Sequence, residues 1–111
     1  MGELTRVEEI LIVAIWHLKG DAYGVRIRQH VSNIIGKDFT YGHLYSALNQ
    51  LAAKDYVVKS EGSVSARRLG RPRVYYSLTP EGLEALRAAM AANEKLWAGI
   101  SRYALEQGKP S

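Results

Sequence analysis

The spacing of apolar residues changes from a helical to a strand period at Tyr56 and returns to a helical period at Thr79. The segments 56–60 and 73–78 are short and rich in β-branched and aromatic residues, which favours strands. Before Tyr56, apolar residues recur every three or four positions, which favours helices. These changes of period predict a mainly α fold that contains a small β-hairpin.

The first helical segment, residues 4–18, is apolar on every side between Ile10 and Trp16. Its β-branched residues would also suit a buried strand, but the helical spacing from Leu4 to Leu18 exceeds the length of a strand. A helix that is apolar all round must be covered on two sides. Because a domain of this size can hardly provide both covers, the segment suggests a partner subunit.

A second helix is expected over residues 23–35, with Asp21 as the cap before it and Gly36 as its C-terminal cap. Its inward face is expected to carry Tyr23, Ile27, Val31 and Ile34. A third helix is expected from Thr40 to about Lys54. Its buried stripe consists of Leu44, Leu48 and Leu51. Three helices and a long-tipped hairpin together predict a winged helix-turn-helix.

The fourth helix is expected to begin at Thr79, which can cap it, with Pro80 in its first position. No stop signal precedes Gly108, so we predict about 28 helical residues, or roughly 42 Å. A heptad seam with one polar member runs along this helix: Leu83, Leu86, Met90, Asn93, Trp97, Ile100 and Ala104. We predict a winged-helix domain of residues 1–79 and a C-terminal dimerisation helix of residues 80–111 that pairs with its copy.

The net charge of +4 at pH 7 lies in one stretch of the chain. Residues 56–79 contain five basic residues and one acidic residue, whereas the rest of the chain is close to neutral. Four of the basic residues crowd the expected wing: Arg67, Arg68, Arg71 and Arg73. Such a loop suits contacts with phosphates or the minor groove, so we predict double-stranded DNA as a partner. The alternative, a winged helix used only for protein–protein contact, does not predict this concentration of charge.

The composition argues against several other classes of protein. The chain has no cysteine, which excludes disulfides, thiolate zinc sites and cysteine nucleophiles. The three histidines lie 13 residues apart, so a metal site is not expected, and no catalytic constellation or phosphate-binding glycine loop stands out. No apolar run reaches the roughly 18 residues that a membrane span needs. With no signal peptide before the first helix, we expect a soluble cytoplasmic protein that is not an enzyme and uses no cofactor.

Three stretches resemble the PadR family of bacterial transcriptional regulators. Tyr23-Gly24 resembles the opening of the family's second helix, and residues 42–51 resemble its recognition-helix signature, Gly-x-Leu-Tyr-x-x-Leu-x-x-Leu. Residues 70–82 resemble the wing and the start of the fourth helix, and this match is the most specific of the three. The resemblance implies a DNA-binding transcriptional repressor. The single C-terminal helix is similar to the short-tailed subgroup, some of whose members bind flat aromatic compounds between the two subunits.

The chain departs from the family's pattern at two places. Thr40-Tyr41 stands where the family usually has Ser or Thr followed by Pro or another small residue. Asp55 stands where a helix-ending glycine is common, and Asp tolerates the left-handed conformation less well than Gly. Neither departure alters the expected fold, and the first bears on which bases are recognised.

The third helix turns its polar side away from its leucine stripe. The residues expected to contact DNA there are Thr40, Tyr41, His43, Tyr45, Ser46 and Asn49. Asn can pair bidentately with adenine, and hydroxyl groups can contact phosphates or bases, although an ordinary polar helix face is the alternative. Tyr45 is expected to face the groove rather than pack under the wing, and Arg26 and Arg28 are expected to contact phosphates.

Trp97 lies on the heptad seam, where packing between subunits is the simpler interpretation. The second interpretation is a slot in which a planar aromatic effector stacks on Trp97. Asn93 would supply a polar contact, and Trp16 or Ile12 would form a wall of the slot. Binding of such an effector is expected to release the repressor from its operator.

Overall fold

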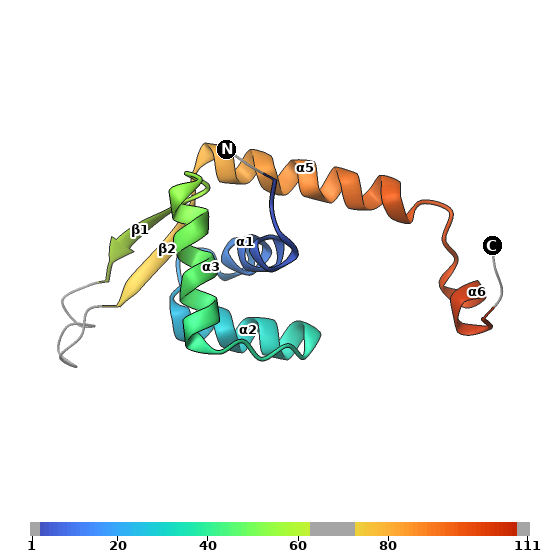
Figure 1. Cartoon of the computed structure of the whole chain (residues 1–111), viewed down its shortest axis with the longest axis horizontal. Coiled ribbons are helices and arrows are strands. Elements are labelled where there is room, and N and C mark those ends of the chain that lie inside the picture. The colour runs from blue at the N-terminus through green and yellow to red at the C-terminus, as the bar shows by residue number, and fades with distance from the viewer. Residues whose placement is uncertain (1–2, 63–72, 109–111) are drawn as a thin grey trace.

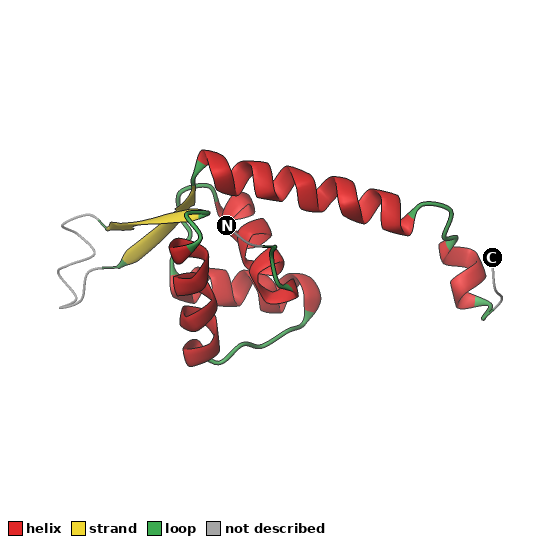
Figure 2. Ribbon diagram, turned by 45° about the horizontal axis from the view of Figure 1, so that its top comes forward, coloured by secondary structure: helices red, strands yellow, loops and turns green. Residues whose placement is uncertain are grey.

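The computed structural model describes residues 3–62 and 73–108 and contains three helices, a two-stranded hairpin and two further helices (Figure 1). The elements in chain order are α1 (Arg6–Leu18), α2 (Gly24–Ile35), α3 (Tyr41–Ala53), β1 (Val57–Glu61), β2 (Val74–Leu78), α5 (Pro80–Trp97) and α6 (Arg102–Glu106). The mainly α fold with a small β-hairpin is confirmed. Figure 2 shows the hairpin extending to one side of the helices and α5 leading away to the other.

A capping box starts α1. The Thr5 hydroxyl accepts a hydrogen bond from the Glu8 backbone at 3.1 Å, and the Glu8 carboxylate accepts one from the Thr5 backbone at 2.8 Å. Together these bonds satisfy two amide groups that the first helical turn leaves without partners. The apolar side chains of Leu11, Ile12 and Ile15 are buried among the other helices, as a helix apolar on most sides requires.

The start and the end of α2 differ in part from the prediction. Tyr23 is the N-cap residue and makes no side-chain capping bond, whereas Asp21 pairs with the Arg26 guanidinium at 3.1 Å. The predicted Asp21 cap is therefore wrong. Gly36 ends the helix with a φ of 68°, as expected for a C-terminal cap. Ile34 was assigned to the inward face but is 64% exposed, because the last turn of α2 extends beyond the packed core.

The predicted start of α3 at Thr40 and its leucine stripe are confirmed. The Thr40 hydroxyl accepts a hydrogen bond from the His43 backbone at 3.2 Å. The stripe is fully buried and consists of Leu44, Leu48 and Leu51. Asp55 follows the helix with a φ of 63°, the left-handed conformation that glycine adopts more easily. Its carbonyl accepts a hydrogen bond from the Thr79 hydroxyl at 2.5 Å, which joins the end of α3 to the start of α5.

The hairpin is antiparallel and is anchored to the helical part of the domain. Val57 pairs with Leu78 at the base, and Glu61 pairs with Val74 at the far end. The backbone amide of Tyr76 donates to the carbonyl of Ala22 at 2.8 Å. This bond attaches β2 to the segment before α2, so the hairpin has a defined orientation relative to the helices.

The C-terminal region is not one continuous helix. α5 ends at Trp97, and Ala98 adopts an extended conformation before Gly99 at a φ of 81°. The turn through Ala98 and Gly99 takes the chain out of the helix, and Ser101 then caps the short α6. The predicted helix of about 28 residues is therefore wrong, and Ile100 lies outside any helix. Within residues 3–62 and 73–108, no helix combines the length and the apolar character that crossing a membrane would require.

Candidate nucleic-acid interface

The helix α3 and the hairpin lie at the same end of the molecule, and α6 lies at the other end (Figure 1). The side chains on the polar side of α3 that were predicted to contact DNA are all exposed: Thr40, Tyr41, His43, Tyr45, Ser46 and Asn49. Of the four wing arginines, Arg73 is described and exposed. The other three, Arg67, Arg68 and Arg71, lie outside the described residues.

An arginine and two tyrosines form a stack at the start of α3. The guanidinium of Arg28 lies 5.0 Å from the centre of the Tyr41 ring, and its Nε donates to the carbonyl of Phe39 at 2.6 Å. The rings of Tyr41 and Tyr45 stack at 6.2 Å with an interplanar angle of 23°. Because cation–π contact and the hydrogen bond both hold the guanidinium, Arg28 is a fixed positive charge beside α3.

The hydroxyl of Tyr45 packs against Gly24, the first residue of α2. A Cβ at this position would overlap that hydroxyl and the adjacent ring carbon. Gly24 thus permits the close approach of α2 and α3, which is a physical reason for the Tyr-Gly pair at the start of α2. Tyr45 has 39% of its surface exposed, so it combines this packing contact with access to solvent.

Two tyrosines hold Arg73 at the base of the wing. Its guanidinium lies 4.4 Å from the centre of the Tyr23 ring, and the Tyr23 and Tyr75 rings meet edge to face at 5.4 Å. A hydrogen bond with Tyr75, followed by the influence of Tyr23, raises the pKa of Arg73 above its usual value. Arg73 is charged at neutral pH, as any arginine is, and these contacts hold that charge directly before β2.

Lys59, on β1, was not among the predicted site residues. Its ammonium group donates to the side-chain oxygen of Asn49 on α3 at 2.7 Å. Both residues line a cleft of about 580 Å³ between α3 and the hairpin. The cleft is lined by Tyr23, Gly24, Val25, Tyr45, Asn49, Lys59, Arg73, Val74 and Tyr76. The sequence places Lys59 in the strand that follows α3, which was a possible signal for a site residue. The order of polar and apolar residues in this strand, however, does not show which face Lys59 occupies.

A second cleft of about 580 Å³ lies between α1 and α5. Trp16 and Asn93 both line it, and the amide of Asn93 donates to the carboxylate of Glu9 at 2.8 Å. Trp97 is 60% exposed but lies outside the cleft lining. Ile12 is fully buried in the core, so its assignment to a wall of the slot is wrong. The structure thus brings together two of the four residues predicted for an effector site.

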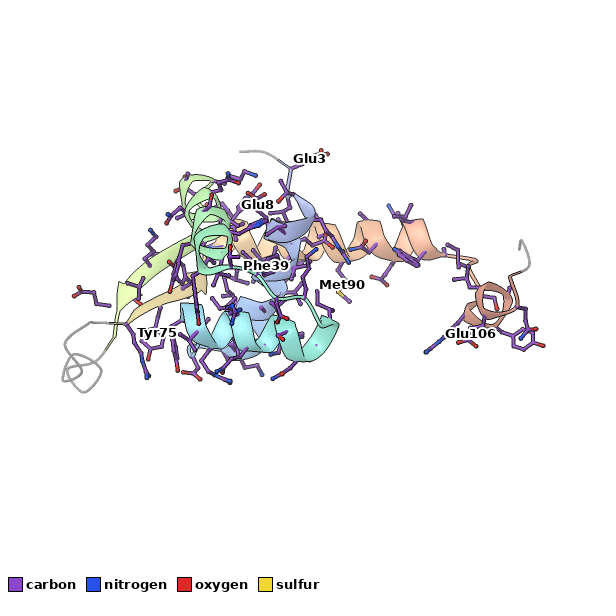
Figure 3. All side chains as sticks on the ribbon, turned by 60° about the horizontal axis from the view of Figure 1, so that its bottom comes forward. Glu3, Glu8, Phe39, Tyr75, Met90 and Glu106 are labelled. Carbon is purple, nitrogen blue, oxygen red and sulfur yellow. The ribbon has the colours of Figure 1, made fainter. Side chains whose placement is uncertain are left out.

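The predicted seam of α5 is divided between the chain's own core and solvent. Leu86 packs in part against the core of its own domain, and Leu83 is half-buried. Met90, by contrast, is 64% exposed, and Figure 3 shows its side chain projecting from α5. The exposed part of the seam therefore begins near Met90 and continues to Trp97.

His17 and His30, which are far apart in sequence, meet between α1 and α2. Their ring nitrogens Nδ1 and Nε2 lie 3.1 Å apart, within hydrogen-bonding distance. Burial, followed by the charges of His17 and Arg26, lowers the pKa of His30. In the part of the chain that the structure describes, no group of three or more His, Cys, Asp or Glu residues is arranged to hold a metal ion.

Comparisons with known proteins agree with this architecture. The sequence profile described as the transcriptional regulator PadR-like family matches residues 12–88. A search of curated proteins found no match. The PadR-like transcription factor of Bacteroides fragilis is 26% identical with a TM-score of 0.69, covering 81% of this chain and 82% of that chain.

Two further solved structures share the fold. The PadR family transcription regulator of Clostridium difficile R20291 is 26% identical with a TM-score of 0.63, covering 89% of this chain and 95% of that chain. RosR of H. salinarum is 23% identical with a TM-score of 0.69, covering 94% of this chain and 88% of that chain. The family consists of transcriptional regulators and not of enzymes, and its winged helix-turn-helix is a DNA-binding fold. Since the family profile spans most of the domain that carries α3 and the hairpin, this chain belongs to the PadR-like family of transcriptional regulators.

Proposed function

We propose that this protein is a sequence-specific repressor that binds a two-fold symmetric DNA operator as a homodimer. The observation that carries the proposal is the shared surface of α3 and the hairpin. This surface presents an exposed polar helix face beside the fixed cations Arg28 and Arg73. A helix with such a face can enter the major groove while the wing contacts the neighbouring backbone or minor groove.

Contacts to bases and to phosphates are assigned to different parts of this surface. Base contacts are proposed for the exposed residues in the first half of α3, which a helix inserted by its N-terminus brings deepest into the groove. They are Tyr41, His43, Tyr45 and Ser46, together with Thr40 at the cap. Phosphate or minor-groove contacts are proposed for the wing arginines, Arg67, Arg68, Arg71 and Arg73, because their charge acts on any sequence.

Dimerisation is proposed to occur through α5. An 18-residue helix is about 27 Å long, and its second half exposes Met90 and Trp97. Exposed apolar side chains along a helix indicate a contact with another surface. A second copy of α5 is a suitable partner, because a two-fold dimer presents the same patch twice. In this proposal, residues 80–111 are the dimerisation segment and residues 1–79 bind DNA.

A planar aromatic effector is a separate proposal. Support comes from the cleft between α1 and α5, where Trp16 is 49% exposed beside the Asn93 amide. An aromatic ring and a few polar groups are typical of pockets for flat ligands. To release DNA, the effector must bind one arrangement of the dimer more tightly than the DNA-competent one.

Selection of bound duplexes from a random-sequence pool tests the main proposal. We expect a consensus with two inverted half-sites centred about ten base pairs apart. Placing that consensus over a promoter should lower transcription of a reporter, whereas increased transcription would indicate an activator. If no duplex shifts in a gel even at low salt, a winged helix used for protein–protein contact would be the better explanation.

A further inference from the structure

The hydrogen bond between Lys59 and Asn49 constrains what Asn49 can recognise. A lysine ammonium group has donors only, so the amide oxygen of Asn49 must face it and the amide NH₂ must point elsewhere. Bidentate recognition of adenine needs the amide oxygen to accept from the base and the NH₂ to donate to it. The oxygen has a second lone pair, but an adenine amino group that used it would approach the Lys59 ammonium group, which lies 2.7 Å from the same oxygen, so two donors would crowd together.

The cleft that contains this pair carries positive charge. Lys59 and Arg73 both line it, and the Asn49 amide contributes a further donor. Among the residues that the structure describes, no carboxylate lines the cleft. A site of this kind suits a ligand that has only acceptors, which is a property of a phosphate group.

The position of the cleft indicates which phosphate it meets. It lies between α3 and the two strands of the hairpin. In the proposed function, α3 enters the major groove while the wing contacts the neighbouring backbone or minor groove. One strand of the DNA backbone separates a major groove from the adjacent minor groove. A protein that contacts both grooves must therefore bring that backbone across the space between helix and hairpin.

We infer that Asn49 and Lys59, with Arg73 lining the same cleft, bind a backbone phosphate of the DNA between α3 and the hairpin, and that Asn49 is not an adenine-contacting residue. Lys59 has two roles, because its charge attracts the phosphate and its hydrogen bond turns the Asn49 NH₂ outward. The inference rests on the proposed function as a DNA-binding protein. Under this inference, Asn49 does not recognise a base but helps to position the protein on DNA of any sequence.

The test compares the selected consensus duplex with a scrambled duplex of the same length and composition. Asn49→Ala is expected to weaken binding to both by the same factor, about three- to tenfold. Lys59→Gln is expected to weaken both and to reduce the slope of log affinity against log salt by about 1. Asn33→Ala, an exposed amide on α2, and Arg102→Gln, an exposed charge on α6, are matched controls that should leave both affinities unchanged.

A neutral methylphosphonate, placed at one backbone position of each half-site in turn, locates the contact. One position should weaken binding by the parent protein and should cause a smaller loss in the Asn49→Ala variant, because that variant already lacks the amide contact and keeps only Lys59 and Arg73. The inference would be overturned if Asn49→Ala lost discrimination at a single base pair while binding the scrambled duplex normally. That outcome would leave the proposed DNA-binding function intact, whereas a parent protein that binds no duplex would overturn both.

Discussion

Glu8 in the first turn of α1 and Lys54 at the end of α3 form a salt bridge of 2.7 Å, although 46 positions separate them in the sequence. The Glu8 side chain is fully buried, and Figure 3 shows it where α1 meets α3. Lys54 also donates to the carbonyl of Glu3 at 3.1 Å. The second carboxylate oxygen of Glu8 is buried and has no hydrogen-bond partner among the described residues. One lysine at the end of α3 thus neutralises a charge that is buried inside the domain.

Replacing Lys54 with Met should destabilise the protein, because the buried Glu8 carboxylate then has no positive partner. We expect the free energy of unfolding to fall by about 3 kcal/mol in urea denaturation. The double variant Glu8→Gln/Lys54→Met should recover most of this loss, since it removes the buried charge. Arg102→Met, which breaks the exposed Arg102–Glu106 pair, should change stability by less than about 0.5 kcal/mol. Equal losses of unfolding free energy in Lys54→Met and Arg102→Met would contradict this account.

Acid should weaken the parent protein more than the Glu8→Gln variant. Burial raises the pKa of Glu8, but hydrogen bonds from Lys54 and Thr5 outweigh it, so its net pKa is lowered in the folded state. A carboxyl with a lowered folded pKa stabilises the protein above its unfolded pKa, and this contribution is lost as the pH falls through the folded pKa. The free energy of unfolding, measured by urea denaturation between about pH 6 and about pH 3, should therefore fall more steeply for the parent than for Glu8→Gln. Parallel curves would exclude Glu8 as the group responsible.

The dimer should depend on the exposed part of α5. Met90→Glu combined with Trp97→Glu would place like charges against their copies, so sedimentation should show a monomer. Met90→Leu combined with Trp97→Phe keeps the apolar character and should leave the dimer intact. A charged double variant that still sediments as a dimer would indicate an interface elsewhere in the molecule.

Removing the wing charge should weaken binding to every sequence. We expect the combined change of Arg67, Arg68, Arg71 and Arg73 to Ala to reduce affinity for consensus and scrambled duplexes alike. It should also lower the slope of log affinity against log salt by about 0.9 for each phosphate contact that is lost. Fluorescence anisotropy at several salt concentrations measures both quantities. An unchanged slope would mean that the wing makes no phosphate contact.

A flat cationic dye should quench tryptophan emission saturably and lower operator affinity by about 5–150-fold. Because Trp16 lines the cleft between α1 and α5, quenching should persist in Trp97→Phe, where Trp16 is the remaining emitter. In Trp16→Phe it should be much weaker. If the quenching disappears only in Trp97→Phe, the site lies on the exposed α5 surface instead of in the cleft.

Signals within one or two helical turns were sufficient to predict much of the fold. Thr40 caps α3 and Thr79 caps α5, because each hydroxyl needs only an amide three residues away. The spacing of the leucines in α3 likewise identified its buried face. Asp21 is not the cap, because α2 begins after Tyr23 and the Asp21 side chain pairs with Arg26.

The composition of the clefts was decided by tertiary structure, whereas α5 ends at a local turn through Ala98 and Gly99. A single Gly99 can be tolerated within a helical pattern, so the sequence did not indicate that it would adopt a positive φ and end the helix region. The contacts of Lys59 with Asn49 and of Lys54 with Glu8 join different elements. Such contacts depend on hairpin register and helix packing, which no local spacing specifies. The sequence alone therefore determined most of the elements, the caps of α3 and α5 and the polar face of α3, whereas packing decided which charges meet across the elements.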